Sequence, residues 1–258
     1  MRIDRRTFLA ASVASVLGAR ATAGDDNRQA RKPIKAILFD AFPLFDPRVV
    51  VALAERLYPE KAATLVAAWR ARQFEYQWLR ALGDRYVDFL EATTESLTYA
   101  AHQSGLSLTE ENRVKLMSAY TELHAWPDTQ EILPKLRELG ISLGILSNMT
   151  IGPLESGLTR GNLRTLFSHV LSTDSVRSFK PSRRAYQLGI DCLGLDREEV
   201  LFVAFAGWDV AGAVWFGYPT YWLNRLGSVP EELSASPWGT GTDLRSLLGF
   251  LEAKMLRS

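Results

Sequence analysis

Short apolar segments recur along this chain, and longer segments with helical periodicity separate them. Most of the apolar segments stop at a polar residue or a turn. They are Ala36–Phe39, Ser142–Leu146, Val170–Ser172, Leu201–Phe205 and Pro219–Leu223. Alternation of strands with helices is typical of a parallel sheet that helices cover on both faces. We therefore expect the α/β fold class, with a Rossmann-like parallel sheet as the core.

The interval between the first two expected strands contains helical patterns and almost no strand pattern. Helical periodicity runs over residues 48–57, 61–82, 84–104 and 109–124. We expect residues 48–125 to form a helical cap domain, inserted into an α/β core made of residues 34–47 and 126–258. An insertion at this point would lie over the carboxyl edge of the sheet and act as a lid.

The composition of this 258-residue chain argues against several kinds of site. The net charge is +1, so no strong field favours nucleic acid as a partner. Cys192 is the single cysteine, which excludes an internal disulfide and a cysteine-based zinc site. His102, His124 and His169 lack the spacing of metal ligands. We expect no metal and no other cofactor.

The N-terminal segment resembles an export signal. Asp4–Leu9 contains a twin-arginine pattern, Phe8–Leu17 is apolar, and Ala21–Ala23 offers a small-residue cleavage site. An ordinary amphipathic helix is the alternative. The apolar segment is too short to span a bilayer as a stable helix. We expect a twin-arginine signal peptide over residues 1–23 and a polar leader over 24–33, with periplasmic localisation and no stable membrane association after cleavage.

Asp40 directly follows the first apolar segment, and a turn that contains Pro43 comes next. Ligands of open α/β sheets bind at the carboxyl ends of the strands. A carboxylate placed there can act as a nucleophile. An aspartate can also simply cap a turn, so this segment alone leaves both interpretations open.

Polar residues follow later strands in the same way. Ser147 and Asn148 come after the second strand, Lys180 precedes a helix, and Asp209 lies beyond the fourth strand. Taken singly, each has an ordinary role in a turn or at a helix start. Because successive strand ends meet at one edge of the sheet, together they predict a nucleophile with a nearby cation and hydrogen-bond donors.

This ordered set resembles the haloacid dehalogenase superfamily and, within it, the type II (S)-2-haloacid dehalogenases. The matching segments are Phe39–Phe42, Trp69-Arg70, Glu75–Arg80, Leu146–Asn148, Lys180-Pro181 with Tyr186, and Trp208-Asp209. The resemblance covers residues 34–252. It implies an enzyme that hydrolyses short (S)-2-haloalkanoic acids to (R)-2-hydroxy acids through an ester on Asp40.

The resemblance also implies roles for residues near Asp40. Lys180 would keep Asp40 ionised, since a nearby ammonium lowers a carboxyl pKa. Asp209 and Lys180 would then activate the water that hydrolyses the ester. Tyr186 would support this group, although a core tyrosine is an equally good explanation.

Other residues would hold the substrate and the leaving halide. Ser147 and the backbone N–H groups of Ala41 and Phe42 would bind the substrate carboxylate. Arg70, Asn148 and Trp208 would surround the halide as charge develops on it. Arg70 falls on the apolar arc of its expected helix, where a guanidinium needs an anionic partner or a polar cavity, or else extends to the surface.

Two alternatives to dehalogenation remain open. A superfamily hydrolase of phosphate esters usually has a second aspartate where this chain has Phe42, and Asp209 is the single acid of the fourth motif. Magnesium needs several oxygen ligands, and the acidic residues near Asp40 and Asp209 are too few to supply them readily. A weakly catalytic protein that binds small organic acids is the other alternative.

A homodimer is expected from the resemblance, and the aromatic segment around Tyr76, Trp78 and Tyr86 would form either the dimer contact or the cap core.

The sequence departs from the family pattern in two motifs. Pro43 replaces a Gly-Thr pair after the nucleophile, and Ala204, Phe205 and Ala206 replace serine and asparagine in the fourth motif. These changes remove hydrogen-bond donors near the nucleophile. Loss of such donors costs about 10²–10³ in rate at the step they serve, which we expect to be ester hydrolysis.

Overall fold

A parallel β-sheet forms the centre of the molecule in a computed structural model that describes residues 32–256. The expected signal peptide and all but the end of the polar leader lie outside the described residues. The described strands are β1 (Ala36–Phe39), β2 (Ser142–Ser147), β3 (His169–Ser172), β4 (Val200–Ala204), β5 (Thr220–Leu223) and β6 (Gly239–Gly241). Their order is β3-β2-β1-β4-β5-β6, with every neighbouring pair parallel.

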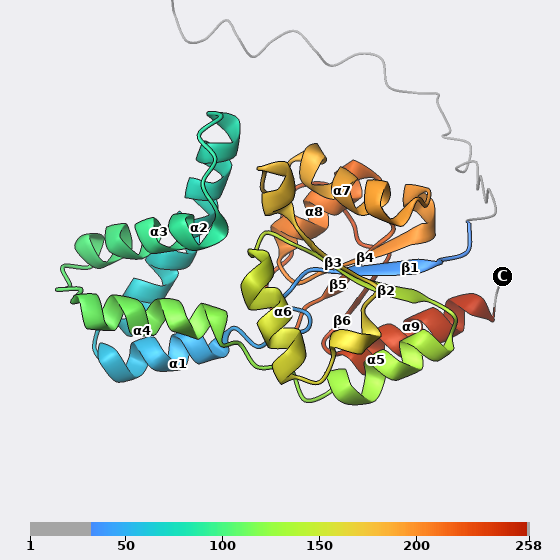
Figure 1. Ribbon diagram of the computed structural model, residues 1–258, viewed down its shortest axis with the longest axis horizontal. Coiled ribbons are helices and arrows are strands. Elements are labelled where there is room, and N and C mark those ends of the chain that lie inside the picture. The colour runs from blue at the N-terminus through green and yellow to red at the C-terminus, as the bar shows by residue number, and fades with distance from the viewer. Residues whose placement is uncertain (1–31, 257–258) are drawn as a thin grey trace, which may run out of the picture. The chain divides into compact units, whose positions relative to one another are not determined.

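Helices cover both faces of this sheet, as expected for the α/β class. The helices are α1 (Arg48–Leu57), α2 (Ala62–Leu82), α3 (Phe89–Gln103), α4 (Glu110–Thr121), α5 (Thr129–Glu138), α6 (Ile151–Arg160), α7 (Arg183–Leu193), α8 (Gly207–Phe216) and α9 (Leu244–Met255). Figure 1 shows α7 and α8 on one face and α5 and α9 on the other. None of these described helices is long and apolar enough to cross a bilayer.

Strand β1 shows how the sequence builds two cores. Successive side chains of a strand point to opposite faces. Ile37 and Phe39 therefore join the core beside α5 and α9, whereas Ala36 and Leu38 join the core beside α7 and α8. Because helices cover both faces, the whole strand is apolar and buried, which produces the short apolar runs of the sequence.

Five strands lie within one residue of their predicted positions, and β6 is the strand that the sequence pattern misses. Its residues, Gly239-Thr240-Gly241, contain no apolar run. Glycine is required here because a Cβ on Gly239 would lie 2.6 Å from the Phe250 ring and 3.0 Å from the Tyr221 ring. The close packing of this edge strand against Phe250 of α9 and Tyr221 of β5 thus requires a glycine at position 239.

Five helices, α1 to α5, lie between β1 and β2, and the first four of them fall within residues 48–125, the expected cap. Helix α3 begins at Phe89, later than the periodicity predicts, because the Asp88 side chain caps it by accepting a hydrogen bond from Glu91 N at 2.8 Å. Where the chain leaves and re-enters the sheet domain, Phe45 and Ala125 form an antiparallel bridge. The segments before α1 and after α4 thus run side by side.

Candidate active site

Asp40 lies at the end of the central strand, where the order of the sheet reverses. β1 pairs with β2 on one side and with β4 on the other. In doubly wound sheets this switch point opens a crevice at the carboxyl ends of the strands. The topology therefore brings the residues that follow β1, β2 and β4 around one point.

Lys180 joins two acidic side chains at this point. Its ammonium lies 2.8 Å from Asp40 Oδ1 and 2.6 Å from Asp209 Oδ2, and all three residues are at least 92% buried. Burial alone would lower the pKa of Lys180. The carboxylates of Asp209 and Asp40 outweigh burial, so the pKa of Lys180 is raised and the side chain stays charged.

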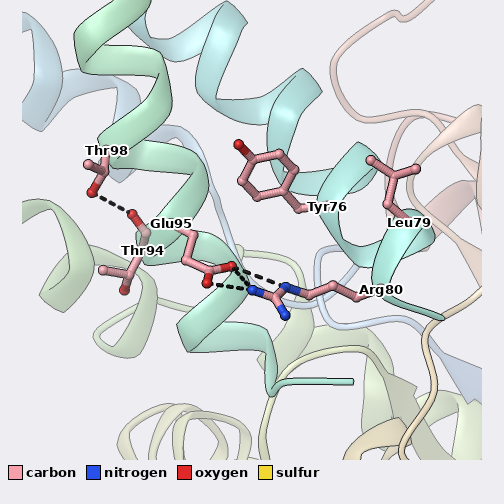
Figure 2. Close-up of a pocket in the computed structure, with 6 residues that line it drawn as sticks. All are labelled: Tyr76, Leu79, Arg80, Thr94, Glu95 and Thr98. Carbon is pink, nitrogen blue, oxygen red and sulfur yellow. Dashed lines mark hydrogen bonds and ion pairs between the residues drawn. The ribbon is translucent and has the colours of Figure 1, made fainter. Parts of the chain in front are cut away.

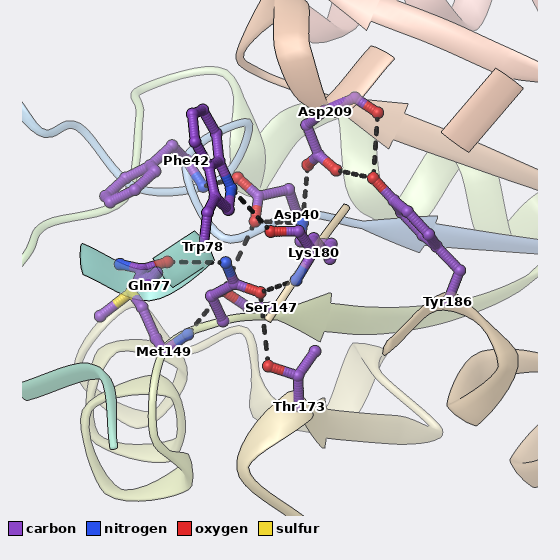
Figure 3. Close-up of polar contacts among 11 residues, drawn as sticks. Asp40, Phe42, Gln77, Trp78, Ser147, Met149, Thr173, Lys180, Tyr186 and Asp209 are labelled. Carbon is purple, nitrogen blue, oxygen red and sulfur yellow. Dashed lines mark hydrogen bonds and ion pairs between the residues drawn. The ribbon is translucent and has the colours of Figure 1, made fainter. Parts of the chain in front are cut away.

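Asp209 is held behind Lys180, at the start of α8. Its Oδ2 accepts from Lys180, and its Oδ1 accepts from the Tyr186 hydroxyl at 2.6 Å (Figure 3). Burial raises the pKa of Asp209 to about 6, and Lys180 counteracts part of that rise. Burial and Asp209 raise the pKa of Tyr186 well above its ordinary value, so Tyr186 remains a neutral donor.

A small cavity of about 30 Å³ lies in front of Asp40. Its lining comprises Asp40, Phe42, Arg70, Phe74, Gln77, Phe89, Ser147, Asn148, Met149, Lys180, Phe205, Ala206 and Trp208. Seven of these are residues that the sequence analysis proposed for catalysis or binding. Ala41, Asp209 and Tyr186 are not in the lining; Asp209 instead binds Lys180, and Tyr186 binds Asp209.

The two oxygens of Asp40 have different surroundings. Oδ1 accepts from Lys180 at 2.8 Å and from the Ser147 hydroxyl at 3.4 Å. Oδ2 receives a single, long hydrogen bond from Phe42 N, at 3.4 Å. Oδ2 is therefore the less constrained oxygen and the one with an electron pair to offer to a ligand in the cavity.

The short loop after Asp40 is fixed by two distant side chains. Trp126 Nε1 donates to the Phe42 carbonyl at 3.0 Å, and Arg225 Nε donates to the Pro43 carbonyl at 2.9 Å. Arg225 is itself held by the buried carboxylate of Asp128. The loop that contains Pro43 in place of the Gly-Thr pair is thus anchored through its carbonyl groups.

Arg70 lies between the cavity and the outside of the cap. The residue is exposed, and among residues 32–256 no carboxylate forms an ion pair with it. Its guanidinium carbon lies 5.9 Å from the Phe74 ring and 6.0 Å from the Phe205 ring. Arg70 and Phe74 also line an open groove on the surface of α2, so Arg70 borders both the cavity and the surface.

Three residues that hydrogen-bond to residues of the site were given no role in the site by the sequence. Gln77 accepts from Asn148 Nδ2 at 2.9 Å, Trp78 Nε1 donates to the Lys180 carbonyl at 3.3 Å, and Thr173 donates to Asn148 Oδ1 at 3.3 Å. Gln77 was detectable, since it continues a stripe of four-residue spacing with Leu65, Trp69 and Gln73. All four are buried, and a polar side chain in such a stripe needs a partner.

Two other features of the described residues carry no comparable chemistry. An open groove of about 530 Å³ on the cap is lined by Tyr76, Leu79, Arg80, Thr94, Glu95 and Thr98 (Figure 2). Its two charged side chains neutralise each other, with Arg80 Nη2 2.6 Å from Glu95 Oε2. In residues 32–256 no cluster of three histidine, cysteine or acidic residues is placed to hold a metal ion.

The fold and the site define an α/β protein with a parallel sheet, a buried aspartate at the end of its first strand, and residues of the inserted helix α2 beside that aspartate. A family model for haloacid dehalogenase-like hydrolases matches residues 34–217. The (S)-2-haloacid dehalogenase of Pseudomonas sp. strain YL is 39% identical over 220 residues, which cover 85% of this chain and 95% of that protein. Haloacetate dehalogenase H-2 of Moraxella sp. strain B is 39% identical over 80% of this chain and 92% of its own.

Solved structures agree with these matches. A crystal structure of an L-2-haloacid dehalogenase superimposes with a TM-score of 0.83 at 40% identity, covering 86% of this chain and all of the other. The L-2-haloacid dehalogenase of Xanthobacter autotrophicus with chloropropionic acid covalently bound gives a TM-score of 0.77 at 32% identity, over 85% and 98% of the two chains. The chain belongs to the haloacid dehalogenase-like hydrolases and, within them, to the (S)-2-haloacid dehalogenase family.

Proposed function

We propose that this protein hydrolyses short (S)-2-haloalkanoic acids to (R)-2-hydroxy acids and halide. The observation that carries this proposal is the environment of Asp40. Lys180 and Ser147 bind Oδ1, which leaves Oδ2 with one long hydrogen bond. Asp40 lines a cavity whose other charged side chains, Arg70 and Lys180, are cationic. A nucleophilic carboxylate facing an anion-binding wall is suited to displacing halide from an anionic substrate.

The first step is a displacement at C2 of the substrate. Asp40 Oδ2 attacks C2 from the face opposite the halogen, so that an O–C bond forms while the C–halogen bond breaks. The bonding electron pair leaves with the halide, and the configuration at C2 inverts. Arg70, Asn148 and Trp208 line the cavity and would stabilise the charge that builds on the halide.

The second step is hydrolysis of the ester. Water adds to the carbonyl carbon of esterified Asp40, the bond from that carbon to the product oxygen breaks, and the alcohol retains the oxygen that Asp40 supplied. One proton of the water passes to that oxygen, and the other leaves to solvent as Asp40 returns to a carboxylate. Lys180 lies against the oxygen on which negative charge develops. Phe205 and Ala206 line the cavity without a polar side chain, so we expect this step to be the slower one.

Substrate entry requires the cavity to widen. About 30 Å³ holds one or two water molecules and not a haloacid. Two hydrogen bonds connect α2 to the sheet domain at the cavity, from Asn148 to Gln77 and from Trp78 to the Lys180 carbonyl. Breaking these two bonds would let the cap move away from Asp40, and their re-formation would exclude water from the displacement step.

A direct assay distinguishes dehalogenation from the alternatives. Purified protein without residues 1–23 is given (S)-2-chloropropionate, its (R) enantiomer, and an aryl phosphate with magnesium. Release of chloride from the (S) substrate alone is the expected result. Phosphate release would instead support a phosphatase. Binding of the unreacted acid, with no product, would support a non-catalytic homologue.

We expect halide release to fall as the pH drops below about 6. At limiting substrate the unreacted protein sets the rate, and in it Asp209 holds the ammonium of Lys180 beside Asp40. The pKa of Asp209 is raised to about 6, so Asp209 is ionised above that pH and loses its charge below it. The rate should decline by about tenfold per pH unit on the acid side.

Variants of Asp209 and of a second partly buried aspartate test this origin of the acid limb. Asp209→Asn should be slow at every pH and should lack the decline near pH 6. Asp174→Asn removes a carboxylate that binds the Tyr86 hydroxyl, away from Lys180, and should retain the wild-type profile. An unchanged acid limb in Asp209→Asn would contradict this assignment.

We propose that residues 1–23 direct export of the folded chain to the periplasm, and that no stable membrane association follows cleavage. The twin-arginine pair Arg5-Arg6, the apolar segment after it and the small residues at Ala21–Ala23 support this proposal. The periplasmic fraction of the full chain, compared with an Arg5→Lys/Arg6→Lys variant, tests it. Equal export of both would argue against a twin-arginine signal.

We propose that the protein forms a homodimer through its cap. Leu79 and Leu82 on α2 are 61% and 83% exposed, and exposed apolar side chains often mark interfaces. The aromatic side chains nearby serve a different purpose, since Trp78 and Tyr86 bind Lys180 and Asp174 of the sheet domain. Light scattering of the purified protein tests this assembly, and a monomeric mass would contradict it.

A further inference from the structure

Gln77 is a fully buried polar residue of α2 that reaches the catalytic cavity. A second buried glutamine on the same helix, Gln73, donates its amide to the Thr93 hydroxyl at 2.6 Å and is thereby satisfied inside the cap. Gln77 instead contacts the sheet domain, where its Oε1 accepts from Asn148 Nδ2. The two glutamines are a matched pair in position and burial that differ in what they face.

The hydrogen bonds around Asn148 fix which way the Gln77 amide points. The backbone N–H of Lys180 can only donate, and it lies 2.8 Å from Asn148 Oδ1. Asn148 must therefore present its NH₂ group to Gln77. Since an NH₂ group needs an acceptor, Gln77 accepts this hydrogen bond with Oε1, and its own NH₂ group points away from Asn148, as Figure 3 shows.

The NH₂ group of Gln77 has no acceptor among the described residues. Gln77 Nε2 is buried and unpaired, and so is Trp208 Nε1. Both side chains line the cavity, and Arg70, the third donor in its wall, has no carboxylate partner in residues 32–256. A buried donor without an acceptor is costly, so two such groups around one cavity, beside the exposed guanidinium of Arg70, indicate a site that an anion completes.

We propose that Gln77 binds the departing halide through Nε2, beside Arg70 and Trp208, and that Asn148 sets the orientation of its amide. This inference rests on the proposed dehalogenation. As Asp40 Oδ2 bonds to C2 and the halogen departs with the bonding electron pair, the N–H of Gln77 donates to the new halide and no proton is transferred. Chloride, which is smaller than bromide, concentrates its charge and gains more from this donor.

The expected effect is a change in leaving-group preference. Hydrogen bonds to charged groups correspond to about 10- to 100-fold in rate. We expect Gln77→Met to slow the single-turnover release of chloride from (S)-2-chloropropionate by about that factor, and to slow bromide release from the bromo analogue less. Gln73→Met removes an equally buried amide that faces Thr93 and should leave the chloride-to-bromide ratio unchanged.

Gln77→Glu separates halide contact from orientation of Asn148. A glutamate retains an oxygen for Asn148 Nδ2 but presents a second carboxylate oxygen, an acceptor, where the NH₂ group was. At pH 8 it should weaken halide binding more than Gln77→Met does. If Gln77 acted only by orienting Asn148, the new carboxylate would slow release of both halides alike and Gln77→Glu would keep the wild-type chloride-to-bromide ratio, which would overturn the proposal.

Calorimetric titration with sodium bromide tests the site without turnover. We expect the wild type and Gln73→Met to bind bromide with equal affinity, and both Gln77 variants to bind it more weakly. Equal affinity in all four proteins would overturn the role of Gln77 while leaving dehalogenation intact. Binding of bromide that depends on Gln77, in a protein that releases no halide, would support the anion site and refute the proposed function.

Discussion

Asp40→Ala should reduce halide release from (S)-2-chloropropionate by at least about 10³-fold, because it removes the nucleophile of the first step. The remaining cavity wall would still bind the substrate, since Arg70 and Asn148 are untouched. Lys180 would keep one buried counter-ion, Asp209, so the fold should survive. The measurement is halide release at saturating substrate, together with circular dichroism of the variant.

A second aspartate of the same loop provides the control. Asp46 lies at the far end of this loop and pairs with Arg48 at the surface, with Arg48 Nη2 2.6 Å from Asp46 Oδ2. Asp46→Ala should keep halide release within about twofold of the wild type, as expected for a surface substitution. Comparable losses in both variants would mean that the loop, and not the carboxylate of Asp40, is what matters.

Lys180→Met should lower the free energy of unfolding by about 3–5 kcal/mol at pH 7, and should abolish activity. The substitution leaves Asp40 and Asp209 buried side by side without their cation. Removing one partner of a buried ion pair is costly because the other charge stays uncompensated. Urea denaturation of both proteins measures this difference.

The pH dependence of that loss identifies its cause. The pKa of Asp209 is already raised to about 6, and removing Lys180 removes the main group that lowers it. A carboxyl whose pKa is raised by folding binds protons more readily in the folded state, so the stability it costs is regained as the pH falls. The defect of Lys180→Met should therefore be smaller at pH 5 than at pH 7.

Lys115→Met is the matched surface substitution for this measurement. Lys115 pairs with Glu111 on α4, where both side chains are largely exposed. Exposed ion pairs contribute little to stability. We expect the stability of this variant to be close to that of the wild type at both pH values. A defect in Lys180→Met that is equal at pH 5 and pH 7 would argue for lost packing and not for uncompensated charge.

The sequence predicts the sheet well because burial on both faces leaves a clear trace. Ala36–Phe39 and Val200–Ala204 are wholly buried, so they read as uninterrupted apolar runs. Gly239–Gly241 has no such run, because a side chain at either of its glycines would collide with Tyr221. A hydrophobicity pattern does not predict a strand whose residues are determined by the side chains packed against it.

The site, like the sheet, has a part that the sequence predicts and a part that it does not. Asp40, Ser147, Asn148 and Lys180 are predictable as a group because strand ends in a parallel sheet converge. The burial of Asp209 is not predictable from the sequence, since its place behind Lys180 depends on the packing of α8 and on the hydrogen bond from Tyr186. The roles assigned to individual residues remain predictions, and the variants of Asp40, Lys180, Asp209 and Gln77 test them one at a time.

The most direct test of the account is a single turnover in water enriched in the heavy oxygen isotope, with protein in excess over (S)-2-chloropropionate. If Asp40 forms an ester that water hydrolyses at its carbonyl carbon, the label enters the peptide that contains Asp40 and the hydroxy acid remains unlabelled. Label in the hydroxy acid and none in that peptide would mean that water attacks C2 directly. That result would contradict the role of Asp40 as nucleophile.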